Sequence, residues 1–388
     1  MLIDPIDPTV NYDGPRAKVA TLSGSSIWGL GDGFGSLVEE QGGRVLGTYR
    51  PRTPYGPGPQ LEHYAAPGGR EFLRIPSYGM VAGEDWSLRA AEWKVFWLLW
   101  QAGVEVLLVG GTSGTCDWRS TDEAVLPGDL VLPWTYFSLD AVPSGLPGTE
   151  LESVLAERVP LMDEPFCPAL ARELAAEVGR LEPAVFRRVH DQDARVVLHR
   201  WQYGAFESRG TTLFLQHYGR SIGCPVITGD CVSPVLARVC GMHLGYYHVP
   251  SNWAEGLRPQ ELTGTLDRLY LETLPRVCAT LELRPRPIRR PGSIRPQDSP
   301  ALLLDEAGKA IAQTPDRATA QRGRGRAWAV VLHQRVDRIN QHASRFPRPD
   351  PLPCAGEGNG SEPLRCPGEA SSLFAAPVAS ARICSWSR

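Results

Sequence analysis

The chain has 388 residues, with 40 Lys and Arg against 43 Asp and Glu, so its formal net charge is −3. This balance argues against a generally basic surface for nucleic acid. Hydrophobic residues make up 42% of the chain, enough for a substantial core, yet no apolar run is long enough to span a membrane. The first residues lack the basic and apolar stretches of a secretory signal. We therefore expect a cytoplasmic protein that contacts neither membrane nor nucleic acid.

The nine cysteines are scattered along the chain and none forms a Cys-x-x-Cys pair. An odd number without paired spacing argues against a disulfide framework and against a zinc ribbon. We expect buried, reduced thiols and no metal site.

The composition divides the chain into three parts. We expect an N-terminal arm at 1–15, one folded domain at 16–283, and a largely disordered tail at 284–388 that is rich in Pro, Arg and Gly. The tail begins with the Arg- and Pro-rich run Arg284–Arg295, which is typical of an extended linker. Its composition cannot bury enough surface to offset the entropy of ordering.

Strand and helix patterns alternate along the folded part. The expected strands, in chain order, are 17–23, 104–109, 129–133, 195–199, 225–228 and 243–249, and the expected helices are 88–102, 167–181, 209–218, 234–240 and 259–274. The run Val104–Val109 is almost wholly apolar, as in strands that are buried on both faces. The alternation predicts an α/β domain with a mixed, mainly parallel central sheet flanked by helices.

Small residues follow two of these strands. Ser23-Gly24-Ser25-Ser26 follows the first strand, and Gly110–Thr115 follows the strand at 104–109. Backbone N–H groups and hydroxyls in such loops can hold an oxyanion. The glycines at 29–35 do not fit the Gly-x-Gly-x-x-Gly register, which argues against a dinucleotide site.

Two further strand ends carry groups suited to a flat heteroaromatic ring. A ring could lie against Phe206 while Glu207 accepts a hydrogen bond from its N–H edge. Asn252 offers both a donor and an acceptor, which suits the edge of a purine. His248, four residues before it, is a further candidate contact. The loops at the ends of parallel strands are where such sheets bind ligands.

Taken in order over about residues 16–280, these segments resemble the trimeric purine nucleoside phosphorylases, including the methylthioadenosine phosphorylase branch. The segments that carry the resemblance are Ser23-Gly24-Ser25, Thr53-Pro54-Tyr55-Gly56, Leu126-Pro127-Gly128-Asp129, Met162–Pro168, Phe206-Glu207-Ser208 and Ser251-Asn252-Trp253-Ala254-Glu255-Gly256.

The resemblance implies a pentosyltransferase of purine salvage. Phosphate would cleave the N-glycosidic bond of a 6-oxopurine nucleoside or a methylthioadenosine-like nucleoside, giving free base and pentose 1-phosphate. Inorganic phosphate would be the co-substrate, with no metal or organic cofactor, and the assembly would be a homotrimer. By resemblance and position, Asn252 and Glu207 would be catalytic; Phe206, Ser251, Thr228, Leu266 and Tyr203 would bind substrate; Ser25, Ser113, Thr112 and Arg74 would bind phosphate.

One part of the family pattern is absent. The family's second phosphate loop carries an Arg and a His, whereas this chain has Ile75–Gly83 at that place, and Arg74 is the nearest substitute. Three hypotheses therefore stay open: a phosphorylase with a rebuilt phosphate loop, a phosphate-independent nucleoside hydrolase, and a non-catalytic purine-binding protein that keeps the fold.

Overall fold

A computed structural model describes residues 6–81, 88–139, 142–152, 162–181, 185–201, 206–230, 232–257 and 274–283, together with two short strands at 303–304 and 310–311. The helix expected at 259–274, except for its last residue, and nearly all of the tail expected at 284–388 lie outside them, so the predicted division into arm, domain and tail stays a prediction.

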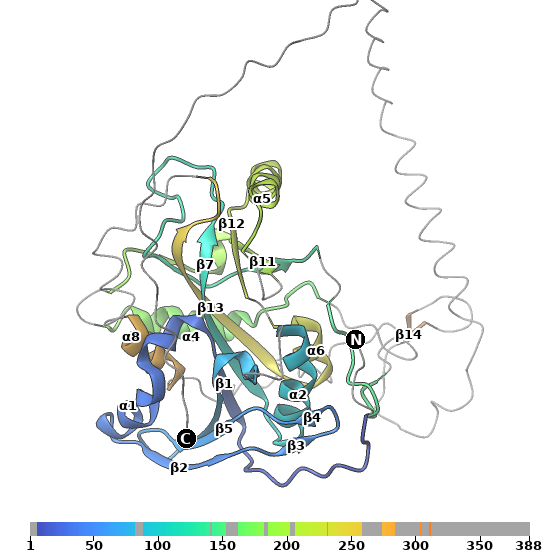
Figure 1. The fold of residues 1–388 in the computed structure, drawn as a ribbon. Helices are drawn as coiled ribbons and strands as arrows, with labels where there is room; N and C mark the ends of the chain where they lie inside the picture. Colours follow the sequence, from blue (N-terminus) through green and yellow to red (C-terminus); the bar gives the residue numbers. More distant parts are fainter. Residues whose placement is uncertain are drawn as a thin grey trace, which may run out of the picture. The chain divides into compact units, whose positions relative to one another are not determined.

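The centre of the described structure is a sheet of eleven strands (Figure 1). These are β1 (Val19–Ser23), β2 (Arg44–Tyr49), β5 (Leu61–Ala65), β6 (Glu71–Ile75), β7 (Val106–Thr115), β8 (Leu130–Val131), β9 (Thr135–Phe137), β10 (Val189–His190), β11 (Val197–Trp201), β12 (Val226–Asp230) and β13 (His243–Trp253). Two small sheets pair β3 (Arg52–Thr53) with β4 (Gly56–Pro57) and β14 (Leu303–Leu304) with β15 (Ala310–Ile311).

Strand β7 pairs with three other strands of the sheet. It pairs with β1 and β13 in parallel and with β12 antiparallel. Beyond β1 the order continues through β6, β5 and β2, and the last two joins are antiparallel. The mixed, mainly parallel sheet that the sequence predicts is therefore confirmed.

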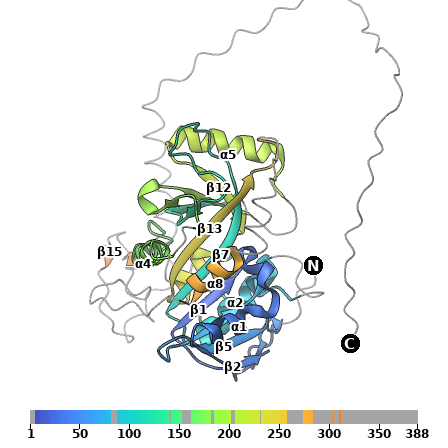
Figure 2. The same cartoon turned by 90° about the vertical axis from the view of Figure 1, so that its left-hand side faces the viewer.

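Helices cover both faces of the sheet (Figures 1 and 2). The described helices are α1 (Phe34–Glu40), α2 (Leu88–Gln101), α4 (Pro168–Val178), α5 (Arg209–Ile222), α6 (Pro234–Val239) and α8 (Leu274–Glu282), with short 3-10 turns η1 (Ser25–Gly33), η2 (Ser77–Gly79) and η3 (Gln192–Ala194). None of them is both long and apolar enough to cross a membrane.

Alternate residues of β7 supply the two core layers, because successive side chains of a strand point to opposite faces. Leu107 and Val109 pack in the layer that holds α2 and α6. Val106 and Leu108 pack in the layer that holds α1, α4 and α8. The five described cysteines are free, and four of them are buried in these layers and beside them.

Strands β7 and β13 run further than the sequence predicts. The segments Gly110–Thr115 and Pro250–Asn252 were expected to be loops, but the first is strand throughout and the second lies in β13 beside it. The ladder between them continues to Thr115 across a register shift after Pro250, and β12 bonds the other edge of β7. Hydrogen bonds from both neighbours thus hold small residues in an extended conformation.

Other parts of the fold were not predicted either. Strands β2, β5 and β6 extend the sheet with antiparallel pairs, and α8 packs in the layer of α1 and α4. Helix α5 ends at Ile222, four residues later than predicted, where Gly223 adopts a left-handed conformation and caps it.

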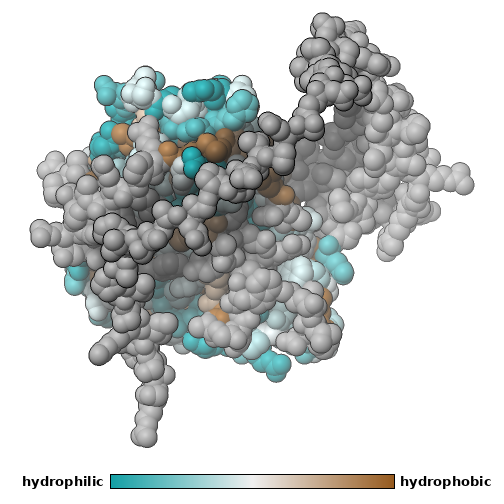
Figure 3. Space-filling model, turned by 45° about the horizontal axis from the view of Figure 1, so that its top comes forward, coloured by the Kyte–Doolittle hydropathy of each residue, from teal (hydrophilic) through white to brown (hydrophobic). Residues whose placement is uncertain are grey.

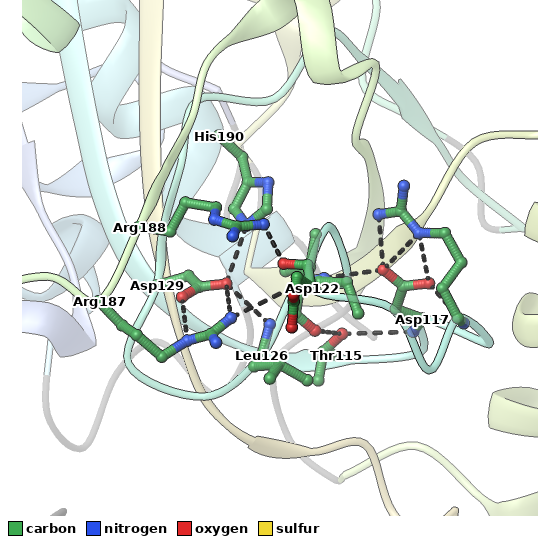
Figure 4. A network of polar contacts seen from close by, with 11 residues as sticks. Thr115, Asp117, Asp122, Leu126, Asp129, Arg187, Arg188 and His190 are labelled. Atoms are coloured by element: carbon green, nitrogen blue, oxygen red, sulfur yellow. Dashed lines mark hydrogen bonds and ion pairs between the residues drawn. The ribbon is translucent and has the colours of Figure 1, made fainter.

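A polar network fixes the segment that links β7 to β8 (Figure 4). The buried carboxylate of Asp129 accepts hydrogen bonds from Arg187 and from the backbone N–H of Leu126, and it lies 2.8 Å from Nε2 of His190. Burial alone raises the pKa of Asp129, but these partners outweigh it and hold the pKa below its ordinary value. The contacts tie the β7–β8 segment to β10.

Candidate functional site

Three strands bring two of the predicted catalytic and substrate-binding residues together. Gly114 of β7 lies opposite Thr228 of β12 on one side and opposite Asn252 of β13 on the other. Neighbouring strands lie about 4.8 Å apart, so the backbones of Thr228 and Asn252 are about 10 Å from one another. Residues that are 24 positions apart in the sequence thus form one row across the sheet.

Glu207 contacts one end of this row. Its side chain is buried, with 7% exposure, and is hydrogen-bonded to the hydroxyl of Thr228. Burial raises the pKa of Glu207, and the nearby carboxylate of Glu255 raises it further, while the bond to Thr228 opposes the shift. A protonated carboxyl presents one donor and one acceptor, which suits the edge of a purine.

The other end of the row is held by hydrogen bonds around Asn252. Its amide nitrogen donates to the carbonyl of Trp253 at 2.8 Å, and its Oδ1 lies 2.8 Å from the hydroxyl of Ser251. That hydroxyl also lies 3.3 Å from the carbonyl of Ser113. Because an amide group has two donor hydrogens, the side chain of Asn252 keeps one for a ligand.

The remaining predicted substrate contacts are placed only in part. Phe206 is 82% exposed, next to Glu207. Hydrophobic surface lies against hydrophilic surface at the end of the molecule that carries α5 (Figure 3). Tyr203 and Leu266 lie outside the described residues, so their roles stay predictions.

The predicted phosphate ligands are not arranged as one cradle. The hydroxyls of Ser25 and Thr112 lie 2.7 Å apart, and Ser25 Oγ also accepts the backbone N–H of Thr112 at 3.0 Å. These two residues lie side by side and are bonded to one another. Ser113 follows Thr112 in a continuous strand, so its side chain points to the opposite face.

Arg74 has other partners. Its guanidinium donates to Glu62 at 2.5 Å and to Ser23 Oγ at 2.8 Å, and it lies over the ring of Phe34 at 4.1 Å. The side chain is 5% exposed. A phosphate role for Arg74 would require breaking this buried ion pair, which costs free energy because an unpaired buried charge would remain.

A second carboxyl lies on the same network and was not predicted from the sequence. Glu282 of α8 accepts hydrogen bonds from Ser23 at 2.5 Å and from the hydroxyl of Tyr247 at 2.9 Å. Burial raises its pKa, and the charge of Arg74 opposes the shift. The network fastens α8 to the end of β1. No group of His, Cys, Asp and Glu in the described part of the chain is arranged to hold a metal ion.

We expect Glu282→Gln to flatten the dependence of stability on pH. A raised pKa means that the folded state binds the proton more tightly, so this contribution is full below the ordinary pKa and is lost as pH rises through the raised one. Urea unfolding between about pH 4 and pH 8 should therefore show a smaller loss of the free energy of unfolding in Glu282→Gln than in the unmodified chain. Glu39→Gln, at an exposed position of α1, is the control. An unchanged pH dependence in Glu282→Gln would contradict a raised pKa of Glu282 in the folded chain.

Searches of the sequence against protein-family profiles and against curated proteins found no match. Solved structures match the fold. A variant of adenosine/methylthioadenosine phosphorylase from Schistosoma mansoni, in complex with adenine, has a TM-score of 0.51 and 17% identity over 69% of this chain and 91% of that chain. Another variant of that enzyme, in complex with methylthioadenosine, has a TM-score of 0.50 and 17% identity over 69% and 90%.

The methylthioadenosine phosphorylase from the same organism, in complex with adenine, has a TM-score of 0.50 and 16% identity over 68% of this chain and 90% of that chain. At these identities the likeness shows the fold. The resemblance that the sequence motifs indicated is therefore confirmed as a likeness of fold.

Proposed function

We propose that this chain binds a purine nucleoside and cleaves its N-glycosidic bond, releasing the free base. The observation that carries the proposal is the row Thr228–Gly114–Asn252 with the buried carboxyl of Glu207 at one end. The fold supports it, because structures of similar fold have been solved with adenine and with methylthioadenosine.

The chemistry follows from the charges that develop during cleavage. As the bond breaks, the purine gains negative charge and the sugar becomes a cation of oxocarbenium type. An amide donor from Asn252 would stabilise the departing purine, and the carboxyl of Glu207, whose pKa is raised by burial, would hold the edge of the purine. These groups are held by their neighbours before substrate arrives, so little reorganisation is needed during the reaction.

The sugar also needs an acceptor. The sequence resemblance implies phosphate, which would give a pentose 1-phosphate, whereas water would give the free pentose. The mutual hydrogen bonds of Ser25 and Thr112 and the pairing of Arg74 with Glu62 favour water. A homotrimeric assembly, a cytoplasmic location and a role in purine salvage remain proposals that derive from the resemblance.

Equilibrium binding of free bases tests the recognition half of the proposal. We expect calorimetry to show that adenine or hypoxanthine binds the full chain, and that Glu207→Ala weakens binding by about ten- to a hundredfold, the value of one hydrogen bond to a partly charged group. Glu173→Gln, at an exposed position of α4, is the control. Equal affinities of Glu207→Ala and the unmodified chain would contradict the site.

A further inference from the structure

Two glycines, Gly24 and Gly111, lie where β1 ends beside β7 and leave the backbone there without side chains. Ser23, the last residue of β1, lies opposite Gly110 of β7. Gly24 and Gly111 are the next residues of these two parallel segments. Glycines at such a place allow close approach to the backbone. The sequence alone indicates room for an oxyanion at this place.

The side chain of Tyr78 fills that room. A Cβ atom built on Gly24 would lie 2.0 Å from the Tyr78 hydroxyl, and one built on Gly111 would lie 2.5 Å from it. Tyr78 is fully buried, with 0% exposure. The glycines are therefore needed to admit the phenol of Tyr78.

The backbone of η2 is left-handed at Tyr78, the residue that carries this ring. Ser77 and Tyr78 have φ values of 51° and 54°, and Gly79 follows with φ 78°. The left-handed conformation is unfavourable for residues with a Cβ, and it persists only where the surroundings enforce it. Two such residues in succession lie at the place where the sequence resemblance puts the second phosphate loop, and their conformation directs the Tyr78 ring toward Gly24 and Gly111.

The neighbouring polar groups suit an uncharged molecule as the acceptor of the sugar. Among the described residues, Arg74 is committed to Glu62 and Ser23. Ser113 shares the face of Gly111 because they are two positions apart in β7. Its hydroxyl is buried and has no hydrogen-bond partner within the described part of the chain. A buried hydroxyl of this kind is a natural partner for a water molecule.

We propose that Tyr78 excludes inorganic phosphate from the site and leaves water as the sugar acceptor. This inference rests on the proposed cleavage of a purine nucleoside. The water oxygen forms a bond to C1′ of the sugar, the C1′–N bond breaks, and its electron pair goes to the purine. One proton of the water ends on the purine, so the products are the free base and the free pentose.

Removing the ring should open the site to phosphate. In the full chain, we expect inorganic phosphate to change neither the melting temperature nor the rate of base release. We expect Tyr78→Gly, which suits the left-handed backbone, to gain saturable stabilisation by phosphate, and Tyr78→Phe, which keeps the ring, to behave as the unmodified chain does. Phe72→Ala, which removes a buried ring from the neighbouring strand β6, controls for a general loss of packing.

The phosphate readout and the base-release readout separate the two proposals. Stabilisation of the unmodified chain by phosphate, or pentose 1-phosphate as its product, would overturn the exclusion by Tyr78. A Tyr78→Gly variant that is folded yet indifferent to phosphate would also overturn it. Absence of base release from every purine nucleoside would instead overturn the proposed function, and the melting temperatures with phosphate would still test Tyr78.

Discussion

Asn252→Ala should lower kcat/KM for base release about 10²- to 10³-fold, the loss that follows removal of one donor from a developing anion. The amide of Asn252 is held by Ser251 and by the carbonyl of Trp253, so its remaining donor is already oriented when substrate binds. The effect should fall mainly on kcat, because the purine carries its negative charge only as the bond breaks.

Steady-state kinetics with a purine nucleoside check this prediction, and Asn11→Ala, at an exposed position of the N-terminal segment, is the matched control. Asn252→Asp sharpens the comparison, since it keeps the shape of the side chain but puts a carboxylate where the donor was. Both substitutions at position 252 should be damaging. Turnover of Asn252→Ala equal to that of the unmodified chain would mean that the leaving purine is stabilised elsewhere.

Glu92→Ala should lower the free energy of unfolding by about 3–5 kcal/mol, because it leaves the charge of Arg200 buried without its carboxylate. Arg200 donates to both oxygens of Glu92, at 2.7 and 2.8 Å, and the backbone N–H of Ser233 donates to the same carboxylate at 2.5 Å. Both side chains are almost fully buried. The pair joins α2, β11 and α6 just before the chain leaves β11 for Phe206 and Glu207.

Urea unfolding of the single variants and of the double variant Glu92→Leu/Arg200→Met measures the coupling between the two residues. We expect the double variant to recover most of the loss, because two apolar groups of similar volume replace a pair that is costly to desolvate. If each single substitution changed the free energy of unfolding by less than about 1 kcal/mol, the pair would not anchor β11.

Local patterns were sufficient to predict part of the central sheet, the strands β1, β7, β8, β11, β12 and β13. The apolar run at 104–109 predicted the buried start of β7, and the helix predicted at 88–102 is α2 to within one residue. The ends of strands were not predictable in the same way. Whether Gly110–Thr115 is loop or strand depends on hydrogen bonds from β12 and β13, and the partners of a strand are not visible in its own residues.

The candidate site could likewise be predicted only where short motifs identify its residues. Thr228 and Asn252 were predicted from short motifs, and the structure places them on either side of Gly114. Arg74 was predicted by its distance along the chain from a family motif, and that distance carries no information on Glu62, with which it pairs across β5 and β6.

Tyr78 was missed for a related reason. A tyrosine in an irregular segment has no periodic signal, and its left-handed backbone angle is set by tertiary contacts. The only clue in the sequence was its position in the segment that stands where the second phosphate loop is expected, followed by a glycine.

Release of free base by the purified full chain tests the central claim most directly. Inosine, guanosine and methylthioadenosine would each be incubated with the protein, and the bases separated by chromatography. We predict that at least one nucleoside yields free base at a rate proportional to protein concentration, and that Asn252→Ala removes most of this rate while Asn11→Ala leaves it unchanged. No base from any of the three, from protein that is folded and binds adenine or hypoxanthine, would contradict an enzyme and identify a purine-binding protein.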